Sequence, residues 1–160
     1  MRYLKRFFES VSDITDVIKK INELVLLCLV DMLDSDFEIS TNISAYGEDI
    51  ICVTIRNRLR NPEWSDARPG FEFDESILSL FSLLKKRYKN TSIIGFTTLR
   101  TGKYGSLFRP PNVIIHGDLP IEVYQVINRV NNLGEYDTIT DFLKEVNRIY
   151  LTKVEIIIKI

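Results

Sequence analysis

His116 is the only histidine of this 160-residue chain, and it ends the apolar run 113–115 just before Gly117 and Asp118. A histidine at a strand end can act as an acid or a base near neutral pH. Three basic residues that could hold a phosphate lie nearby in sequence, namely Arg100, Lys103 and Arg109. An enzyme acting on a phosphate-bearing substrate around His116 is therefore one hypothesis. Because His116 has no cysteine, second histidine or nucleophile pair beside it, we expect a structural turn residue and no catalytic residue.

Three arginines alternate along one stretch of chain, at positions 56, 58 and 60. In a continuing strand, residues two apart lie on the same face, so these guanidinium groups point the same way. Arginine suits bidentate contact with a carboxylate or a phosphate. The following loop carries the only tryptophan, which either binds a ligand or pins the loop to the core. The candidate binding residues are Arg56, Arg58, Arg60, Trp64, Arg100, Lys103 and Arg109.

The rival interpretation of these arginines is internal pairing with the acidic residues 34–38, one strand away. The two interpretations differ in whether the arginines face a partner or the chain itself. An internal pair at the surface contributes at most about 1 kcal/mol to stability.

Charge is divided unevenly along the chain, although the formal net charge is only -1. Residues 1–55 carry five basic and ten acidic residues, and residues 56–116 carry eleven basic and five acidic ones. Residues 117–160 carry five basic and seven acidic residues. The basic segment 56–116 can bind nucleic-acid phosphates, an acidic protein, or the acidic segment 1–55 of a second copy.

The sequence contains no pattern of residues typical of a metal or cofactor site. One histidine and two cysteines do not make a zinc site of the usual kind. The acidic cluster 31–38 and the pair Glu48 and Asp49 lack the spacing of a calcium-binding loop, and we interpret them as solvated surface. Cys28 and Cys52 lie in apolar runs and are expected to be reduced core thiols. We therefore predict no metal site and no cofactor.

Apolar periodicity then predicts the elements that position these residues. Helical spacing covers 12–33, and alternation predicts a hairpin of strands over 37–43 and 49–58. Further predicted elements are a helix at 74–88, strands within 92–100 and 109–117, helices at 120–132 and 138–150, and a strand at 153–160. The long irregular stretch 59–73 contains two prolines and a glycine.

The predicted order α-β-β-α-β-β-α-α-β does not alternate regularly, which argues against a doubly wound parallel sheet. We predict one α+β domain over residues 1–160, with a mainly antiparallel sheet of about five strands and helices packed on one face. The last strand should pair inside the sheet, because an exposed edge of sequence KVEIIIKI would invite aggregation.

Composition sets the remaining expectations. With 45% hydrophobic and 27% charged residues the chain is of ordinary globular type, not disordered. The longest apolar run, 24–30, is far shorter than the roughly 20 residues of a membrane span, and we expect a cytoplasmic protein without a membrane partner. Abundant Ile, Lys and Asn with two alanines are typical of AT-rich coding sequences, as in low-GC bacteria and their phages.

Function follows from these features only as a hypothesis. The apolar surplus on the first helix and the segregated charge favour a non-enzymatic protein-binding or assembly protein, such as a viral or host accessory subunit that self-associates or binds a protein partner. The alternatives are a nucleic-acid-binding module that uses the basic segment 56–116 and the enzyme around His116.

Overall fold

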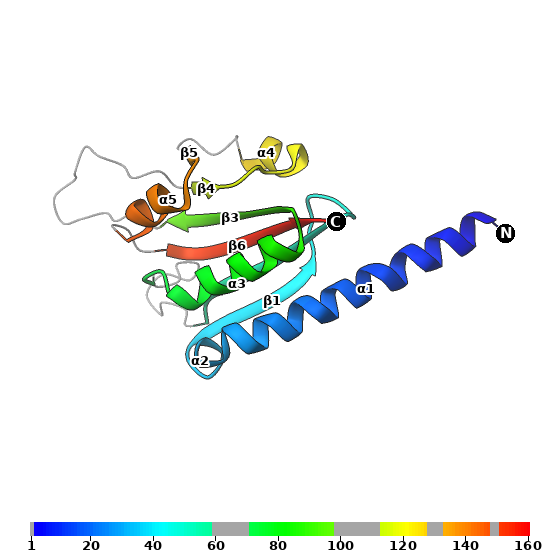
Figure 1. Ribbon diagram of the computed structural model, residues 1–160, viewed down its shortest axis with the longest axis horizontal. Coiled ribbons are helices and arrows are strands. Elements are labelled where there is room, and N and C mark those ends of the chain that lie inside the picture. The colour runs from blue at the N-terminus through cyan, green and yellow to red at the C-terminus, as the bar shows by residue number, and fades with distance from the viewer. Residues whose placement is uncertain (1, 59–70, 98–112, 128–132, 148–150) are drawn as a thin grey trace.

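The computed structural model describes residues 2–58, 71–97, 113–127, 133–147 and 151–160, and it is an α+β fold as predicted (Figure 1). The helices are α1 (Arg2–Cys28), α2 (Val30–Leu33), α3 (Glu75–Arg87), α4 (Ile121–Ile127) and α5 (Ile139–Val146). The strands are β1 (Phe37–Ile43), β2 (Ile50–Asn57), β3 (Asn90–Thr97), β4 (Val113–His116), β5 (Leu133–Tyr136) and β6 (Leu151–Lys159).

The strands form one mixed sheet in the order β1-β2-β6-β3-β4-β5. All neighbours are antiparallel except β4 and β5, which are parallel. The last strand, β6, lies between β2 and β3, so the prediction that it pairs inside the sheet is confirmed.

The sheet has one strand more than the predicted five. Residues 133–136 were expected to connect the predicted helices 120–132 and 138–150, but they form β5 at the sheet edge. This strand has four residues and a glycine, so its own pattern is too short to show alternation. It forms because α4 returns the chain alongside β4.

The first helix is longer than predicted and is broken once. It begins at Arg2 rather than near Ser12, because residues 2–11 continue the helical spacing of apolar residues. It ends at Cys28, and Leu29 leaves helical geometry with φ -116° and ψ 23° before α2 begins. Thr138 caps the start of α5, since its Oγ1 accepts a hydrogen bond from the Asp141 amide at 3.1 Å.

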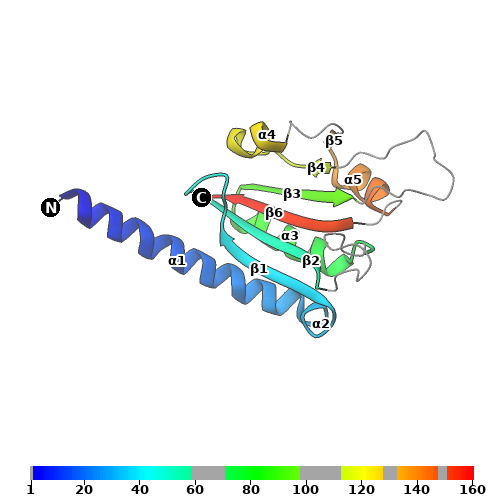
Figure 2. The same cartoon turned by 180° about the vertical axis from the view of Figure 1, so that it is seen from behind.

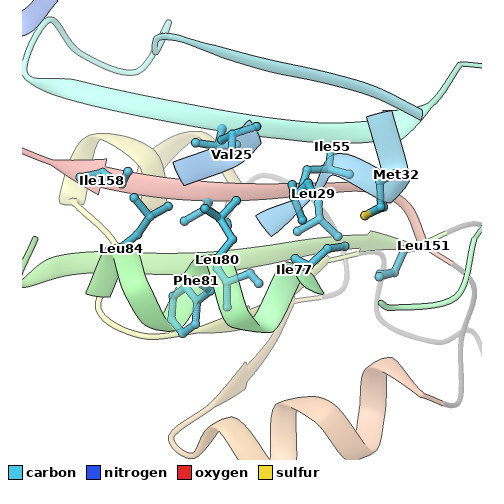
Figure 3. Packing of buried hydrophobic residues seen from close by; sticks show 14 of the residues in the cluster. Val25, Leu29, Met32, Ile55, Ile77, Leu80, Phe81, Leu84, Leu151 and Ile158 are labelled. Carbon is cyan, nitrogen blue, oxygen red and sulfur yellow. The ribbon is translucent and has the colours of Figure 1, made fainter. Parts of the chain in front are cut away.

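Helices α1, α3 and α5 cover one face of the sheet (Figures 1 and 2). Figure 3 shows side chains from α1, α2 and α3 meeting those of β2 and β6 in the main core. The prediction that all helices pack on one face is wrong for α4. Its Val123 and Ile127 pack on the opposite face with Ile94, Ile115 and Ile157.

Truncation in the central strand should therefore be costly. Ile156 of β6 is fully buried, and Ile156→Ala leaves a cavity that lowers the free energy of unfolding by about 2–5 kcal/mol. Urea denaturation measures this loss. Ile43→Ala is the matched control, because Ile43 lies in edge strand β1 and is 50% exposed, and it should cost about 1 kcal/mol or less. Equal losses would contradict the central position of β6.

Candidate functional site

Arg56 lies on β2 and pairs with Glu38 of β1, which is its register partner. Its Nη2 donates to Glu38 Oε1 at 2.6 Å and its Nε donates to Oε2 at 3.0 Å. The hydrogen bond to Glu38 and the charge of that carboxylate raise the pKa of Arg56. This bidentate pair joins the first basic residue of the predicted face to the acidic segment, which is the internal pairing that the rival interpretation describes.

The other members of the predicted basic face are placed as follows. Arg58 is exposed and its Nη2 donates to the Phe37 carbonyl at 3.2 Å. The remaining candidates lie outside the described residues, namely Arg60, Trp64, Arg100, Lys103 and Arg109. A binding face built on all seven therefore stays a prediction.

A second ion pair lies beside Arg56 on the same face of the sheet. Lys153 of β6 is the register partner of both Arg56 and Phe96, so one row of side chains crosses four strands from Glu38 to Phe96. The Lys153 Nζ lies 2.7 Å from Glu155 Oε1 and 3.9 Å from the centroid of the Phe96 ring. Glu155 is 7% exposed, and its Oε2 has no hydrogen-bond partner within the described part of the chain.

The buried charge of Glu155 acts on its neighbours. Burial, and then the charge of Glu155, raise the pKa of Tyr46 to about 12 and that of the Cys52 thiol to about 12. Cys52 is therefore a protonated, unreactive thiol at neutral pH. Both cysteines are free, as predicted, and Cys28 is half-buried. Sequence reasoning missed this cluster, although Lys153 and Glu155 stand two apart in a strand and so share a face.

His116 and Asp118, which the sequence brings close, lie in different environments. His116 is 7% exposed, and its ring packs against Phe81 and Phe142 on the helix-covered face. Its Nδ1 is 3.0 Å from the Tyr136 carbonyl oxygen. Asp118 is exposed and lines a cleft on the other side of the strand end. The histidine thus makes the contacts of a core residue.

This cleft lies where the parallel strands β4 and β5 end and has a volume of about 330 Å³. Gly117 lines the cleft directly after β4. Its φ of 95° is a conformation that favours glycine, and a Cβ added there would lie 3.2 Å from the Thr91 carbonyl oxygen. The lining residues are Ile115, Gly117, Asp118, Leu119, Tyr124, Glu135, Tyr136 and Asp137. Three carboxylates give the cleft a negative character.

The acidic cleft could not be predicted, because its position depends on the unpredicted strand β5. A hydrogen bond to Glu135, and the charge of that carboxylate, raise the pKa of Tyr124. In the described ranges, no three His, Cys, Asp or Glu side chains are grouped as they would be around a metal ion.

An exposed apolar patch covers the outer side of the α1–α2 junction. Leu26 is 60% exposed, Leu27 is 72% exposed and Val30 is 50% exposed. The opposite side of the same helix is buried, with Val25 and Leu29 in the main core (Figure 3). We call Leu26, Leu27 and Val30 the outer apolar patch. The excess of apolar residues noted in the sequence is thus divided between the core and the surface.

Comparison of the chain with protein-family models, with curated protein sequences and with solved structures returns no match. Among the helices that the structure describes, none is long and apolar enough to cross a membrane.

The buried Glu155 predicts a test of its ion pair. Lys153→Met keeps most of the packing but leaves Glu155 buried without its cation, which should lower the free energy of unfolding by about 3 kcal/mol. Chemical denaturation measures this loss, and adding Glu155→Gln should recover most of it.

Lys159→Met is the matched control on the same face of β6. Its partners Glu122 and Asp49 are 41% and 53% exposed, so this change should cost about 1 kcal/mol or less. If the two lysine variants lost the same stability, the Lys153–Glu155 pair would be an ordinary surface pair.

Proposed function

We propose that this chain is a non-enzymatic protein-binding or assembly protein whose docking surface is the outer apolar patch. The exposure of Leu26, Leu27 and Val30 carries this proposal, because the opposite side of the same stretch of chain, with Val25 and Leu29, is already buried in the main core. Clustered large apolar side chains on a surface are unfavourable in water, at about 25 cal/mol per Å². Such clusters typically mark interaction sites.

The rim of the patch indicates the chemistry of the partner. Glu23, Asp31 and Asp34 are exposed around it, one helical turn from the apolar residues. Complementary charge steers association and fixes orientation. The fitting partner is therefore a protein surface that offers an apolar groove edged by Lys or Arg. An accessory subunit of a virus or its host, working in the cytoplasm with its two thiols reduced, agrees with this surface and with the composition.

A nucleic-acid-binding module remains the second candidate, because residues 56–116 carry eleven basic residues against five acidic ones. It is less favoured, since Arg56 is already neutralised by Glu38. Nucleic-acid binding that weakens steeply with salt would support this candidate instead. The enzyme hypothesis is the least favoured, because the His116 ring packs between two aromatic rings and away from Asp118.

Leu27→Gln should weaken partner binding without lowering the melting temperature. Loss of a central apolar anchor costs about 1–2 kcal/mol of binding free energy, which is roughly a tenfold or greater loss of affinity. The wild-type chain is first used to capture its partner from a lysate of the native host, and the captured protein is identified and purified. Titration of that protein against wild type and each variant then measures the affinity.

The matched control is Leu83→Gln, which makes the same change at a 38% exposed leucine of α3, outside the patch. It should leave the affinity unchanged. Equal binding by wild type and Leu27→Gln would show that the patch is not the docking surface.

A further inference from the structure

The apolar residues of α1 recur at seven-residue spacing over the whole helix. One series is Leu4, Val11, Ile18 and Val25, and the other is Phe7, Ile14, Ile21 and Cys28. When these series are the a and d positions of a heptad, all nine charged residues of α1 fall at b, c and f. The e and g positions are uncharged as well. This is the pattern of a helix made to lie against another surface along its full length.

Within the described part of the chain, it is the C-terminal part of this stripe that packs in the core. Ile21, Val25 and Leu29 are buried in the main core, and Val17 and Ile18 are partly buried against it. Ile14 does not belong to that core cluster. The N-terminal part of α1 projects past the end of the sheet (Figures 1 and 2). The seven-residue repeat thus continues into the part of α1 that lies beyond the sheet.

We propose that residues 2–16 of α1 pair with the same segment of a second copy of this chain, as an antiparallel helix pair. This inference deepens the proposed assembly function by naming a second copy as partner, on a different part of α1 from the outer apolar patch. The pairing centres on Glu9, which lies at an outward f position. Each a position then meets a d position, with Leu4 opposite Ile14 and Phe7 opposite Val11.

Charge selects the antiparallel arrangement. Arg2, Lys5 and Arg6 form the basic end of the segment, and the following charged residues, Glu9, Asp13 and Asp16, are acidic. A parallel pair places two basic ends together and two acidic stretches together. An antiparallel pair brings each basic end toward the acidic stretch of the other copy. Because these charges lie at b, c and f, outside the apolar seam, they act at longer range and disfavour the parallel pair by repulsion between like ends.

The fold also lowers the cost of this pairing. Starting a helix is unfavourable, whereas extending one adds a hydrogen bond for each residue that is fixed. The C-terminal half of α1 is held on the sheet, so it supplies the nucleus from which residues 2–16 extend. Two antiparallel segments also leave the two sheets at opposite ends of the helix pair.

Light scattering after size exclusion tests the proposal on the full chain. Wild type should move from the 18.6 kDa monomer toward twice that mass as its concentration rises through the micromolar range. Val11→Glu places a charge at an a position and should hold the protein at the monomer mass. Ser12→Glu makes the same change in charge one residue later, at an outward b position, and should leave the dimer intact.

Three results would overturn the dimer. They are a wild type that stays monomeric throughout, a Val11→Glu variant that still dimerises, and a Ser12→Glu variant that dissociates as fully as Val11→Glu. Unchanged melting of the sheet domain in each variant shows that dissociation is not unfolding. If wild type stays monomeric but loses its partner on Leu27→Gln, the helix pairing is wrong and the outer apolar patch stands. If wild type dimerises and Leu27→Gln still binds the partner, the outer apolar patch is wrong and the helix pairing stands.

Disulfide formation tests the orientation. In a Cys28→Ala background, one preparation carries Phe7→Cys and the other carries Val11→Cys. The antiparallel pair predicts that a disulfide between positions 7 and 11 forms when the two are mixed and oxidised, while each alone stays largely uncrosslinked. Crosslinking of each preparation with itself, and not with the other, would overturn the antiparallel arrangement.

Discussion

Burial of β6 on both faces is the constraint on which the rest of the structure depends. This strand pairs with β2 and β3, so its position fixes the register of the antiparallel part of the sheet. Its Val154, Ile156 and Ile158 require cover on one face, and its Ile157 requires cover on the other. The amphipathic helices α1 and α3 supply the first cover and α4 contributes to the second. Because the pleat alternates, the same strand also sets Lys153 and Glu155 beside the Glu38–Arg56 pair.

Helix α1 is longer than is needed to cover the sheet. The sheet needs only the C-terminal half of the helix, yet the seven-residue repeat continues to Leu4. The outer side of the helix is charged as far as Glu23 and becomes apolar at Leu26. The helix therefore carries three apolar surfaces, and among the described residues one of them, that of Ile21 and Val25, is buried in the main core. The outer patch and the projecting segment remain for other molecules, which is the physical basis of the proposed assembly role.

Long periodic segments could be predicted from the sequence, and features made by distant pairing could not. The hairpin, α3 and the interior position of β6 follow from local alternation, from helical spacing and from the danger of an exposed apolar edge. By contrast, β5 has four residues and forms only because β4 is beside it. The acidic cleft and the placement of α4 depend on that pairing and were missed with it. The Glu38–Arg56 contact was anticipated as one of two alternatives, because sequence spacing gives the face of an arginine but not its partner.

Hydrogen–deuterium exchange with residue-level resolution, at low and high protein concentration, tests most directly whether α1 serves both the fold and assembly. The account predicts strong, concentration-independent protection in β6 and in residues 21–28 of α1, which the core holds. It predicts protection of residues 2–16 that rises with concentration, because the paired helix cannot fray. Protection of residues 2–16 that is the same at both concentrations would contradict the account.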